Sequence, residues 1–462
     1  MNRNTGVAAG LLLFFLFAPF AHGYPYSNPT VPDSAELVLE GVLIRGNWNI
    51  TDDVIINTLD WEVGTVFNEK KLADGQTKLE TTDLFRSVEL STRRGNKPGS
   101  IIVVVQVREK RLPYIDWFEA HHYSTGYAFN LFELETYTKN RTNYLKSDLR
   151  LTDPWSGFFL DYTLSPFGNM STKFYGTSEA SWQTWSIPAL PEREGFEYTL
   201  NRFGLEGGIQ FSTSTFGRIR FGIDYNITNI NDDPIRYEDE DDSDGEEIDN
   251  PNQLPQPLRD VKDTNWTGLN LVLEKDGRDD DLFPHSGSLI YAPIYFASDS
   301  EADDQFIRFE IDARRYIPIS RGTTLALRAR AGFIEGDSPF YQRFNLSTGN
   351  GIRGVSDGWV DSPNGGTRMI QTAFELRHPL TGRWPDSFIN LLLFSEAGAS
   401  WNDEDPVYSN DPDYSDLKLT IGWGLAFHIP VLGPLSLSIG YPLIAPDDAE
   451  GINARLNFGM AF

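Results

Sequence analysis

Apolar and polar residues alternate along most of the chain from residue 113 to the C-terminus. Segments 307–314, 417–428 and 452–462 are clear cases, with apolar residues at every second position and polar or small residues between them. In the last segment the apolar positions are Ile452, Ala454, Leu456, Phe458, Met460 and Phe462. Side chains of a strand point alternately to its two faces, so this period of two predicts β-strands with one apolar and one polar face.

These strands fit a membrane barrel better than a soluble sandwich. A sandwich turns its apolar faces inward and a membrane barrel turns them toward lipid; segments of about ten residues with Trp and Tyr near their ends favour the barrel. Strand starts are expected near residues 113, 127, 143, 157, 172, 200, 217, 265, 287, 306, 323, 368, 388, 417, 434 and 452. That number is even, as a closed single-chain barrel requires.

The connections between these strands also fit a barrel. In its second half, short connections at 213–216, 320–323 and 431–434 alternate with long ones at 228–264, 335–367 and 402–416. Outer-membrane barrels have this asymmetry, with short periplasmic turns and long external loops. The expected fold class is therefore mainly β, with residues 111–462 as a 16-stranded antiparallel transmembrane β-barrel.

Residues 35–110 have a different pattern, with helical segments between strands. AELVLEGVLIRGN indicates a strand that ends near Gly46, and FRSVELST with SIIVVVQVRE indicates a hairpin around 94–96. Thr51 and Asn68 are expected to cap two helices between these strands, because their side-chain oxygens accept hydrogen bonds from first-turn amides. The predicted order is strand, helix, helix, strand, strand (βααββ), which makes a small α+β domain before the barrel.

Residues 1–23 have the pattern of a signal peptide. A basic Arg3 precedes an apolar run from Val7 to Phe20, and Ala21 and Gly23 occupy the places of small residues at a cleavage site. The run is too short for a comfortable spanning helix. The mature chain is therefore expected to be exported, with residues 24–34 as a linker.

Composition excludes several functions. The chain has no cysteine, which excludes a disulfide framework, a thiol active site and a cysteine zinc site. A formal net charge of −27 argues against a nucleic-acid partner. The acidic run 237–250 is similar to a calcium-binding loop, but Pro251 stands where a bidentate acid belongs. We interpret it as a solvated external loop, and whether it binds divalent ions stays open.

The stretch GNGIRGVSDG (349–358) allows two interpretations. Its second half, Gly354 to Gly358, matches the G-x-S-x-G elbow of serine hydrolases, which needs a strand before it and a helix after it. The following residues GWVDSPNGG cannot form that helix, so Ser356 is not expected to be a nucleophile. Neither an enzymatic activity nor a cofactor is expected. The other interpretation is a tight glycine turn that carries Arg353 on the sixth external loop.

The small domain resembles a POTRA (polypeptide-transport-associated) domain. The resemblance rests on IRGNWNITDDVI (44–55), Gly64, LFRSV (84–88) and VQVRE (105–109), in a single copy. It implies a periplasmic module that offers the edge of the strand 85–92, with Phe85, Val88 and Leu90, to extended client chains by β-augmentation. An inert spacer is the alternative.

The barrel segment resembles the BamA/TamA superfamily of outer-membrane assembly barrels, here as one POTRA domain plus a bacterial surface antigen barrel. The matching motifs are LEKDGRDDDLFPHSG (273–287), the Arg353-Gly354 pair, FELRHPL (374–380), LFSEAGASW (393–401) and the terminal Phe462. The resemblance implies that the sixth loop folds into the lumen and that Arg353 pairs with Glu396. Glu375 and Arg377 share one face of a strand and could join this tether.

The chain departs from the family pattern at two positions. Val355 stands where the family has an aromatic residue, which puts in doubt the packing that this residue provides, and Glu396 replaces an aspartate.

The resemblance implies an outer-membrane assembly factor that assists insertion and folding, or translocation, of outer-membrane proteins. The strand 112–120 and the C-terminal strand, with Leu456, Phe458 and Phe462, would form a seam that opens laterally. Expected partners are unfolded outer-membrane protein clients and outer-membrane lipid and lipopolysaccharide, and the sequence leaves open whether periplasmic proteins or lipoproteins also bind. The barrel would lie in the bacterial outer membrane with the POTRA-like domain in the periplasm.

Three alternatives remain. A two-partner-type secretion pore belongs to a related group, although 24–34 is too short and proline-rich for its plug helix. A passive channel or a structural antigen would need neither the POTRA-like domain nor the arginine loop.

Overall fold

The fold was analysed in a computed structural model. It describes residues 37–47, 50–80, 82, 84–109, 115–120, 125–138, 141–152, 155–164, 172–187, 196–213, 217–231, 263–280, 283–300, 303–320, 322–344, 346, 351–354, 366–382, 387–401, 417–429, 433–444 and 453–458. The predicted signal peptide, the linker and the acidic run 237–250 lie outside these residues, as do Val355, Ser356 and Phe462.

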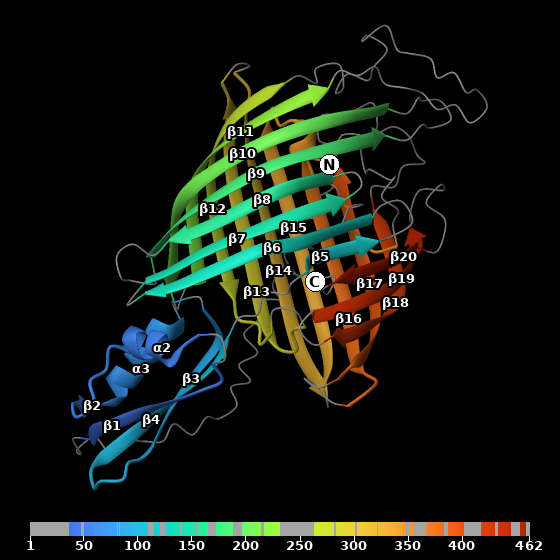
Figure 1. Ribbon diagram of the computed structural model, residues 1–462. Coiled ribbons are helices and arrows are strands. Elements are labelled where there is room, and N and C mark those ends of the chain that lie inside the picture. The colour runs from blue at the N-terminus through green and yellow to red at the C-terminus, as the bar shows by residue number, and fades with distance from the viewer. Residues whose placement is uncertain are drawn as a thin grey trace, which may run out of the picture.

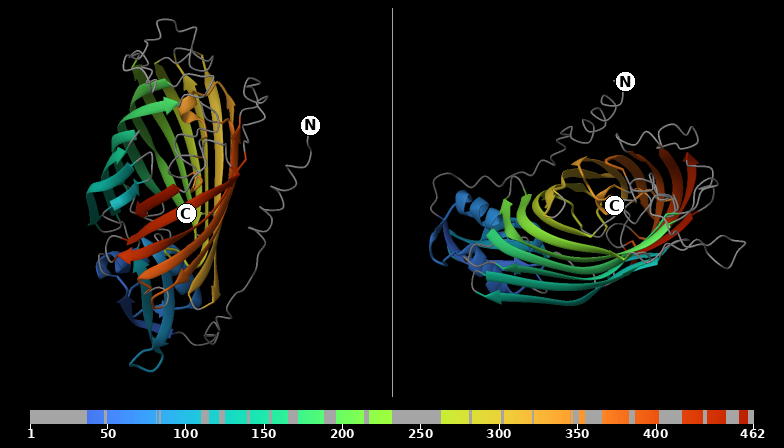
Figure 2. Two further views of the ribbon diagram at one scale, coloured as in Figure 1. Left: turned by 90° about the vertical axis from the view of Figure 1, so that its right-hand side faces the viewer. Right: turned by 90° about the horizontal axis from the view of Figure 1, so that it is seen from above.

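The small N-terminal domain is a four-stranded sheet with two helices, placed at one end of the barrel (Figures 1 and 2). Its elements are β1 (Leu37–Arg45), α2 (Asp52–Leu59), β2 (Val66–Phe67), α3 (Glu69–Glu80), β3 (Phe85–Arg94) and β4 (Ser100–Glu109). The strand order is β2-β1-β4-β3, with β1 and β4 parallel. The two-residue strand β2 is an addition to the predicted order, and it pairs with β1 through Leu37 and Phe67.

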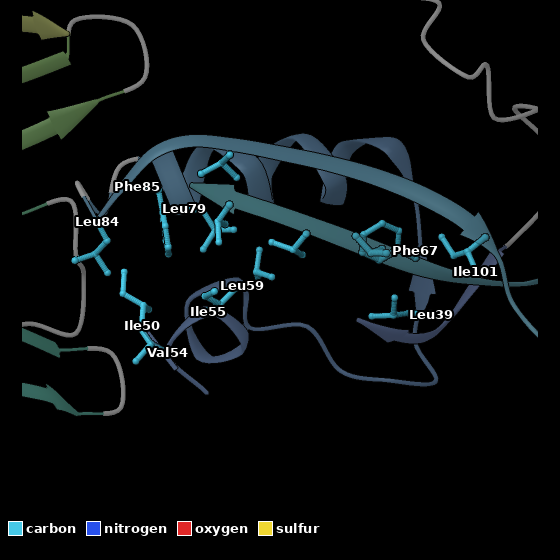
Figure 3. Close-up of a cluster of buried hydrophobic side chains, with 14 residues drawn as sticks. Leu39, Ile50, Val54, Ile55, Leu59, Phe67, Leu79, Leu84, Phe85 and Ile101 are labelled. Atoms are coloured by element: carbon cyan, nitrogen blue, oxygen red, sulfur yellow. The ribbon is translucent and has the colours of Figure 1, made fainter. Parts of the chain in front are cut away.

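The helices of this domain cover a core of buried apolar side chains (Figure 3). Ile55 and Leu59 from α2 and Leu79 from α3 pack on the sheet and are at most 1% exposed. Asn68 caps α3 as predicted, since its Oδ1 accepts a hydrogen bond from the Lys71 amide at 2.9 Å. The predicted side-chain cap at Thr51 is wrong, because Thr51 occupies the N-cap position of α2 without a side-chain hydrogen bond. Neither helix has the length and apolar character needed to cross a membrane.

The remaining described strands form a closed antiparallel barrel in which each strand pairs with its neighbours in sequence and β20 pairs with β5. The strands are β5 (Ile115–Ala120), β6 (Thr125–Thr138), β7 (Arg141–Thr152), β8 (Trp155–Leu164), β9 (Thr172–Ile187), β10 (Phe196–Thr213), β11 (Gly217–Asn231), β12 (Thr264–Asp276), β13 (Gly287–Asp299), β14 (Gln305–Ser320), β15 (Thr323–Gly336), β16 (Arg368–Pro379), β17 (Ile389–Trp401), β18 (Lys418–Ile429), β19 (Gly433–Ile444) and β20 (Asn453–Phe458). Strand β10 begins four residues before the expected start near residue 200. The predicted fold class, a mainly β antiparallel barrel behind a small α+β domain, is confirmed.

The alternation of the strands has its apolar face outward. On β18, Ile421 and Trp423 are exposed, whereas Lys418 and Thr420 are buried in the interior. The same holds around the wall, where the exposed apolar side chains include Phe203, Leu205, Phe211, Phe221, Ile223, Tyr225, Leu269, Leu273, Leu393, Leu437, Tyr441 and Leu443. A soluble sandwich would bury these residues, so an apolar exterior around a polar interior identifies a barrel made for lipid.

Candidate functional site

The connection between β15 and β16 turns into the barrel interior. Its described part includes a 3₁₀ turn, Phe340–Gln342, and its tip carries Ile352, Arg353 and Gly354. Ile352 and Leu346 are fully buried in an apolar cluster that lines the lumen near the barrel end away from the small domain. The wall contributes Trp266, Ala297, Phe306, Ile334 and Met369 to this cluster. This cluster, which we call the apolar seat, therefore holds the loop in addition to Arg353.

Arg353 lies against two carboxylates of the wall. Its Nε donates to Glu396 Oε1 at 2.6 Å, and its backbone amide donates to Glu396 Oε2 at 2.7 Å. Nη1 donates to Glu375 Oε2 at 2.6 Å. The guanidinium carbon also lies 3.7 Å from the ring centre of Phe394. All three charged side chains are at most 2% exposed, so water competes little for these charge-assisted bonds.

Local strand geometry explains how the carboxylates meet the loop. Phe394 and Glu396 are two residues apart on β17 and share its inner face, as the period of two requires. Glu375 and Arg377 share the inner face of the neighbouring strand β16, where Arg377 Nε donates to Glu375 Oε1 at 2.7 Å. The structure thus brings together Arg353, Glu396, Glu375 and Arg377, the charged residues of the tether proposed from the sequence.

Gly354 places the loop tip directly on the barrel backbone. Its φ is +90°, a conformation that side-chain-bearing residues rarely adopt. A Cβ on Gly440 of β19 would lie 2.6 Å from Gly354 Cα, so both positions need glycine for this contact. Gly440 pairs with Asn453 of β20. The loop tip therefore contacts the strand that supports the C-terminal strand.

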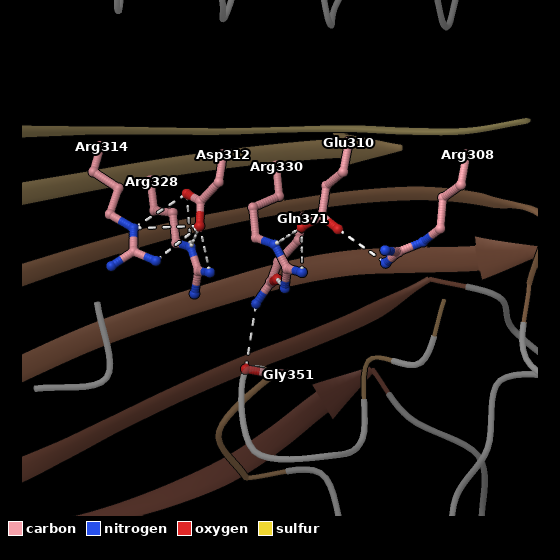
Figure 4. A network of polar contacts seen from close by, with 8 residues as sticks. All are labelled: Arg308, Glu310, Asp312, Arg314, Arg328, Arg330, Gly351 and Gln371. Carbon is pink, nitrogen blue, oxygen red and sulfur yellow. Dashed lines mark hydrogen bonds and ion pairs between the residues drawn. The ribbon is translucent and has the colours of Figure 1, made fainter. Parts of the chain in front are cut away.

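Ion pairs continue along the lumen beside the loop (Figure 4). Asp312 accepts from Arg328 at 2.7 Å and from Arg314 at 2.8 Å, and Glu310 accepts from Arg330 at 2.7 Å. Arg330 also donates to Gln371 Oε1 at 2.9 Å, and Gln371 Nε2 donates to the Gly351 carbonyl at 3.3 Å. This network is a second polar attachment of the loop.

The seam between β20 and β5 closes the barrel. In the described part of the chain these strands pair from Leu456↔Ala120 to Phe458↔Phe118. Of the seam residues proposed from the sequence, Leu456 and Phe458 lie on β20, and Phe462 lies beyond the described residues.

The proposed client edge of the small domain is an outer strand of its sheet. β3 pairs with β4 alone in the sheet order. Phe85 and Val88 are buried in the domain core, and Leu90 packs against it. These side chains therefore face away from a client, which would meet the backbone of β3 instead.

Two parts of the site were missed from the sequence. The apolar seat has a sequence signal, because Phe306-Ile307, Phe333-Ile334 and Met369-Ile370 interrupt the alternation and place one apolar side chain inward. The contact between Gly354 and Gly440 has no local signal, since it joins residues that are far apart in the chain. Among the described residues, no cluster of His, Asp or Glu could hold a metal ion.

Comparisons with known proteins agree with this geometry. The Omp85 superfamily domain matches residues 131–462. The chain is 22% identical to the outer membrane protein assembly factor BamA of Nitratidesulfovibrio vulgaris over 483 residues, which cover 97% of this chain and 56% of that protein. The chain thus spans little more than half the length of this curated relative.

Solved structures share the fold. BamA of Haemophilus ducreyi lacking POTRA domains 1–3 superposes with a TM-score of 0.55 at 16% identity, covering 92% of this chain and 85% of that chain. CdiB from Acinetobacter baumannii superposes with a TM-score of 0.52 at 13% identity, covering 92% and 74%. The family match includes most strands of the lipid-facing barrel and the loop arginine held in its lumen. This chain belongs to the Omp85 superfamily.

Proposed function

We propose that this protein is an outer-membrane assembly factor that assists the insertion and folding of outer-membrane proteins. The barrel would lie in the bacterial outer membrane with the POTRA-like domain in the periplasm. The observation that carries the proposal is the pairing of the C-terminal strand β20 with the first barrel strand β5, beside a strand that the tethered loop contacts. A relative whose name states outer membrane protein assembly supports the same function.

A seam between the first and last strands suits this function because a client strand needs a free edge. Unpaired N–H and C=O groups of an edge strand can template another strand, and a closed barrel otherwise removes such edges. Opening the seam would separate β20 from β5 and leave the other strand pairs intact. A client could then pair with β5 or β20 while the rest of the wall stays closed.

The other parts have matching roles in this proposal. The backbone edge of β3 would receive extended clients by β-augmentation before they reach the seam. The loop tether would hold β16 and β17 together and press the loop tip on β19, so that the wall next to the seam keeps its shape. No covalent bond is made or broken, so neither an enzymatic activity nor a cofactor is required. Clients would be unfolded outer-membrane proteins, with outer-membrane lipid and lipopolysaccharide around the barrel.

The test is the folding of a urea-unfolded outer-membrane barrel into liposomes, with and without this protein. The proposal predicts faster folding with the wild type and a loss of that acceleration in Arg353→Ala. A matched control is Arg314→Ala, which removes another luminal arginine that bonds to Asp312.

No acceleration by the wild type, together with steady ion conductance across the same liposomes, would reject the proposal. That result would favour a two-partner-type polypeptide secretion pore or a passive channel.

A further inference from the structure

The small domain contacts the barrel at the turn between β12 and β13. Arg86 of β3 forms an ion pair with Asp276 at 3.0 Å, and the Arg86 side chain is 4% exposed. Arg108 of β4 donates to the Asp279 carbonyl at 2.8 Å and to Asp280 Oδ2 at 2.7 Å. Both arginines thus lie on neighbouring strands of one sheet and hold one turn.

The carboxylates of this turn also organise the turn itself. Asp279 Oδ1 accepts hydrogen bonds from the amides of His285 and Ser286 at 2.9 and 3.0 Å. Asp280 Oδ1 accepts from the Phe283 amide at 3.0 Å. One oxygen of Asp280 therefore binds the small domain and the other accepts from the Phe283 amide. The same carboxylate thus takes part in docking and in fixing the conformation of the turn.

The opposite side of the turn reaches the loop tether. Phe283 is buried against Leu392 and Ala426 of the wall. The Pro284 carbonyl accepts from Arg377 Nη1 at 3.2 Å, and the Arg377 guanidinium lies 5.5 Å from the ring centre of Phe283. Arg377 in turn donates to Glu375, which accepts from Arg353. Direct contacts thus run from the small domain to the loop tip.

We propose that the turn 276–287 is a positioning element that makes docking of the POTRA-like domain and tethering of the sixth loop mutually dependent. Among the contacts described above, Arg377 links the turn to the tether carboxylate Glu375. When the domain is docked, the turn holds Phe283 and Pro284 against Arg377, and Arg377 holds Glu375 in the position that Arg353 requires. When the domain leaves, the turn loses the contacts of Arg86 and Arg108. The turn then no longer holds Phe283 and Pro284 against Arg377, and the tether loses this support. The inference does not depend on the proposed assembly activity.

A second contact makes docking a defined state. Lys173 of β9 donates to the Thr82 carbonyl at 2.9 Å, in the segment between α3 and β3. The domain is therefore held at two separate places on the barrel rim. A mutual dependence between distant sites requires two discrete states. Here these states would be the docked and the undocked arrangement of the small domain.

The experiment is hydrogen–deuterium exchange of the full-length protein in liposomes, followed in three peptides. Peptide 280–286 reports on the turn, 346–354 on the loop tip and 80–88 on the docked edge of the small domain. The variant is Arg86→Ala combined with Arg108→Ala. In this variant the Asp276 carboxylate keeps Arg278 as a partner at 2.8 Å, and Asp280 keeps the hydrogen bond from the Phe283 amide at 3.0 Å. The matched control is Arg93→Ala, an exposed arginine at the far end of β3.

The proposal predicts faster exchange in both the turn and the loop tip of the double variant, by about 5- to 150-fold, the usual range of coupling between sites. The control should exchange like the wild type. Coupling is reciprocal, so Arg353→Ala should in turn accelerate exchange in peptide 80–88. Phe283→Leu alters the middle of the chain of contacts and leaves the docking arginines Arg86 and Arg108 in place. This variant should accelerate exchange in peptide 346–354 as well.

Two results would overturn the proposal. Faster exchange in the turn with an unchanged loop tip would make docking and tethering independent. Unchanged exchange in peptide 80–88 of Arg353→Ala would break the required reciprocity, even if the double variant proved poorly folded.

Discussion

Removing the Arg353 side chain should release the loop tip from the barrel wall. In Arg353→Ala the carboxylate of Glu396 loses its charged partner in an interior where it is 2% exposed, while Glu375 keeps Arg377. Breaking a buried ion pair from one side costs about 3–5 kcal/mol. At 1.4 kcal/mol per factor of ten, the population of released loop should rise by roughly 100- to 4000-fold. The apolar seat of Ile352 and Leu346 remains, so the loop should loosen rather than unfold completely.

The assay is hydrogen exchange at the Ile352 amide, which donates to the Leu346 carbonyl at 2.8 Å in the wild type. This amide remains in the variant and reports on the loop tip alone. The control Arg314→Ala removes an arginine of the same lumen whose partner, Asp312, keeps Arg328. Exchange of Ile352 should be unchanged in that control.

A double variant tests the assigned cause. Arg353→Met combined with Glu396→Gln removes both the cation and the carboxylate that it would leave unpaired, so the loop should regain part of its protection. If Arg353→Ala left Ile352 exchange within a factor of about five of the wild type, under 1 kcal/mol, then the apolar seat alone would hold the loop and the tether argument would be refuted.

Three further predictions follow from other contacts. Gly440→Ala should accelerate hydrogen exchange at the loop tip, because the added Cβ would lie 2.6 Å from Gly354 Cα. Such overpacking costs roughly 1–3 kcal/mol, which corresponds to an acceleration of about 5- to 150-fold. The control is Gly207→Ala, where no atom lies within 4 Å of the new Cβ. Ile223→Arg, on the outer face of β11, should lower the free energy of unfolding from bilayers by about 2–4 kcal/mol, and an unchanged urea midpoint would contradict a lipid-facing wall. The hydrogen bond from Ser100, with those from Asn96 and Lys97, lowers the pKa of Glu40 from 4.5 to about 2. Because the folded-state pKa is the lower one, this contact should stabilise the 95–100 hairpin turn above about pH 4.5, and the stabilisation should be lost as the pH falls toward 2. Hydrogen exchange in this turn, corrected for intrinsic exchange rates, measures the effect. The variant Glu40→Gln should abolish this pH dependence.

Much of the fold could be predicted because it depends on local periodicity. The alternation at Ile421 and Trp423 identified strands with an apolar face, and the structure turns that face outward. The pairing of Arg353 with Glu396 was expected from the resemblance to the BamA/TamA superfamily, and the period of two then placed Glu396 and Glu375 on the inner faces of their strands.

The rest depends on register and long-range packing. The contact between Gly354 and Gly440 exists only because β19 is aligned so that this glycine faces the loop tip, and a shift by one residue would turn it to the other face. Thr51 shows the limit of local rules, since its side chain makes no cap despite the favoured residue type. The docking of Arg86 and Arg108 on the turn joins two domains and has no sequence pattern of its own.

The most direct test of the proposed function is to lock the seam between β20 and β5. The chain has no cysteine, so the pair Glu119→Cys and Asn457→Cys, which are register partners in the pairing of β20 with β5, is chosen for a single engineered disulfide. The folding of a urea-unfolded outer-membrane barrel into liposomes is then measured with oxidised and reduced protein. Acceleration that is lost on oxidation and restored by a reductant is the expected result. Equal acceleration in both states, with the disulfide verified, would show that clients do not use this seam.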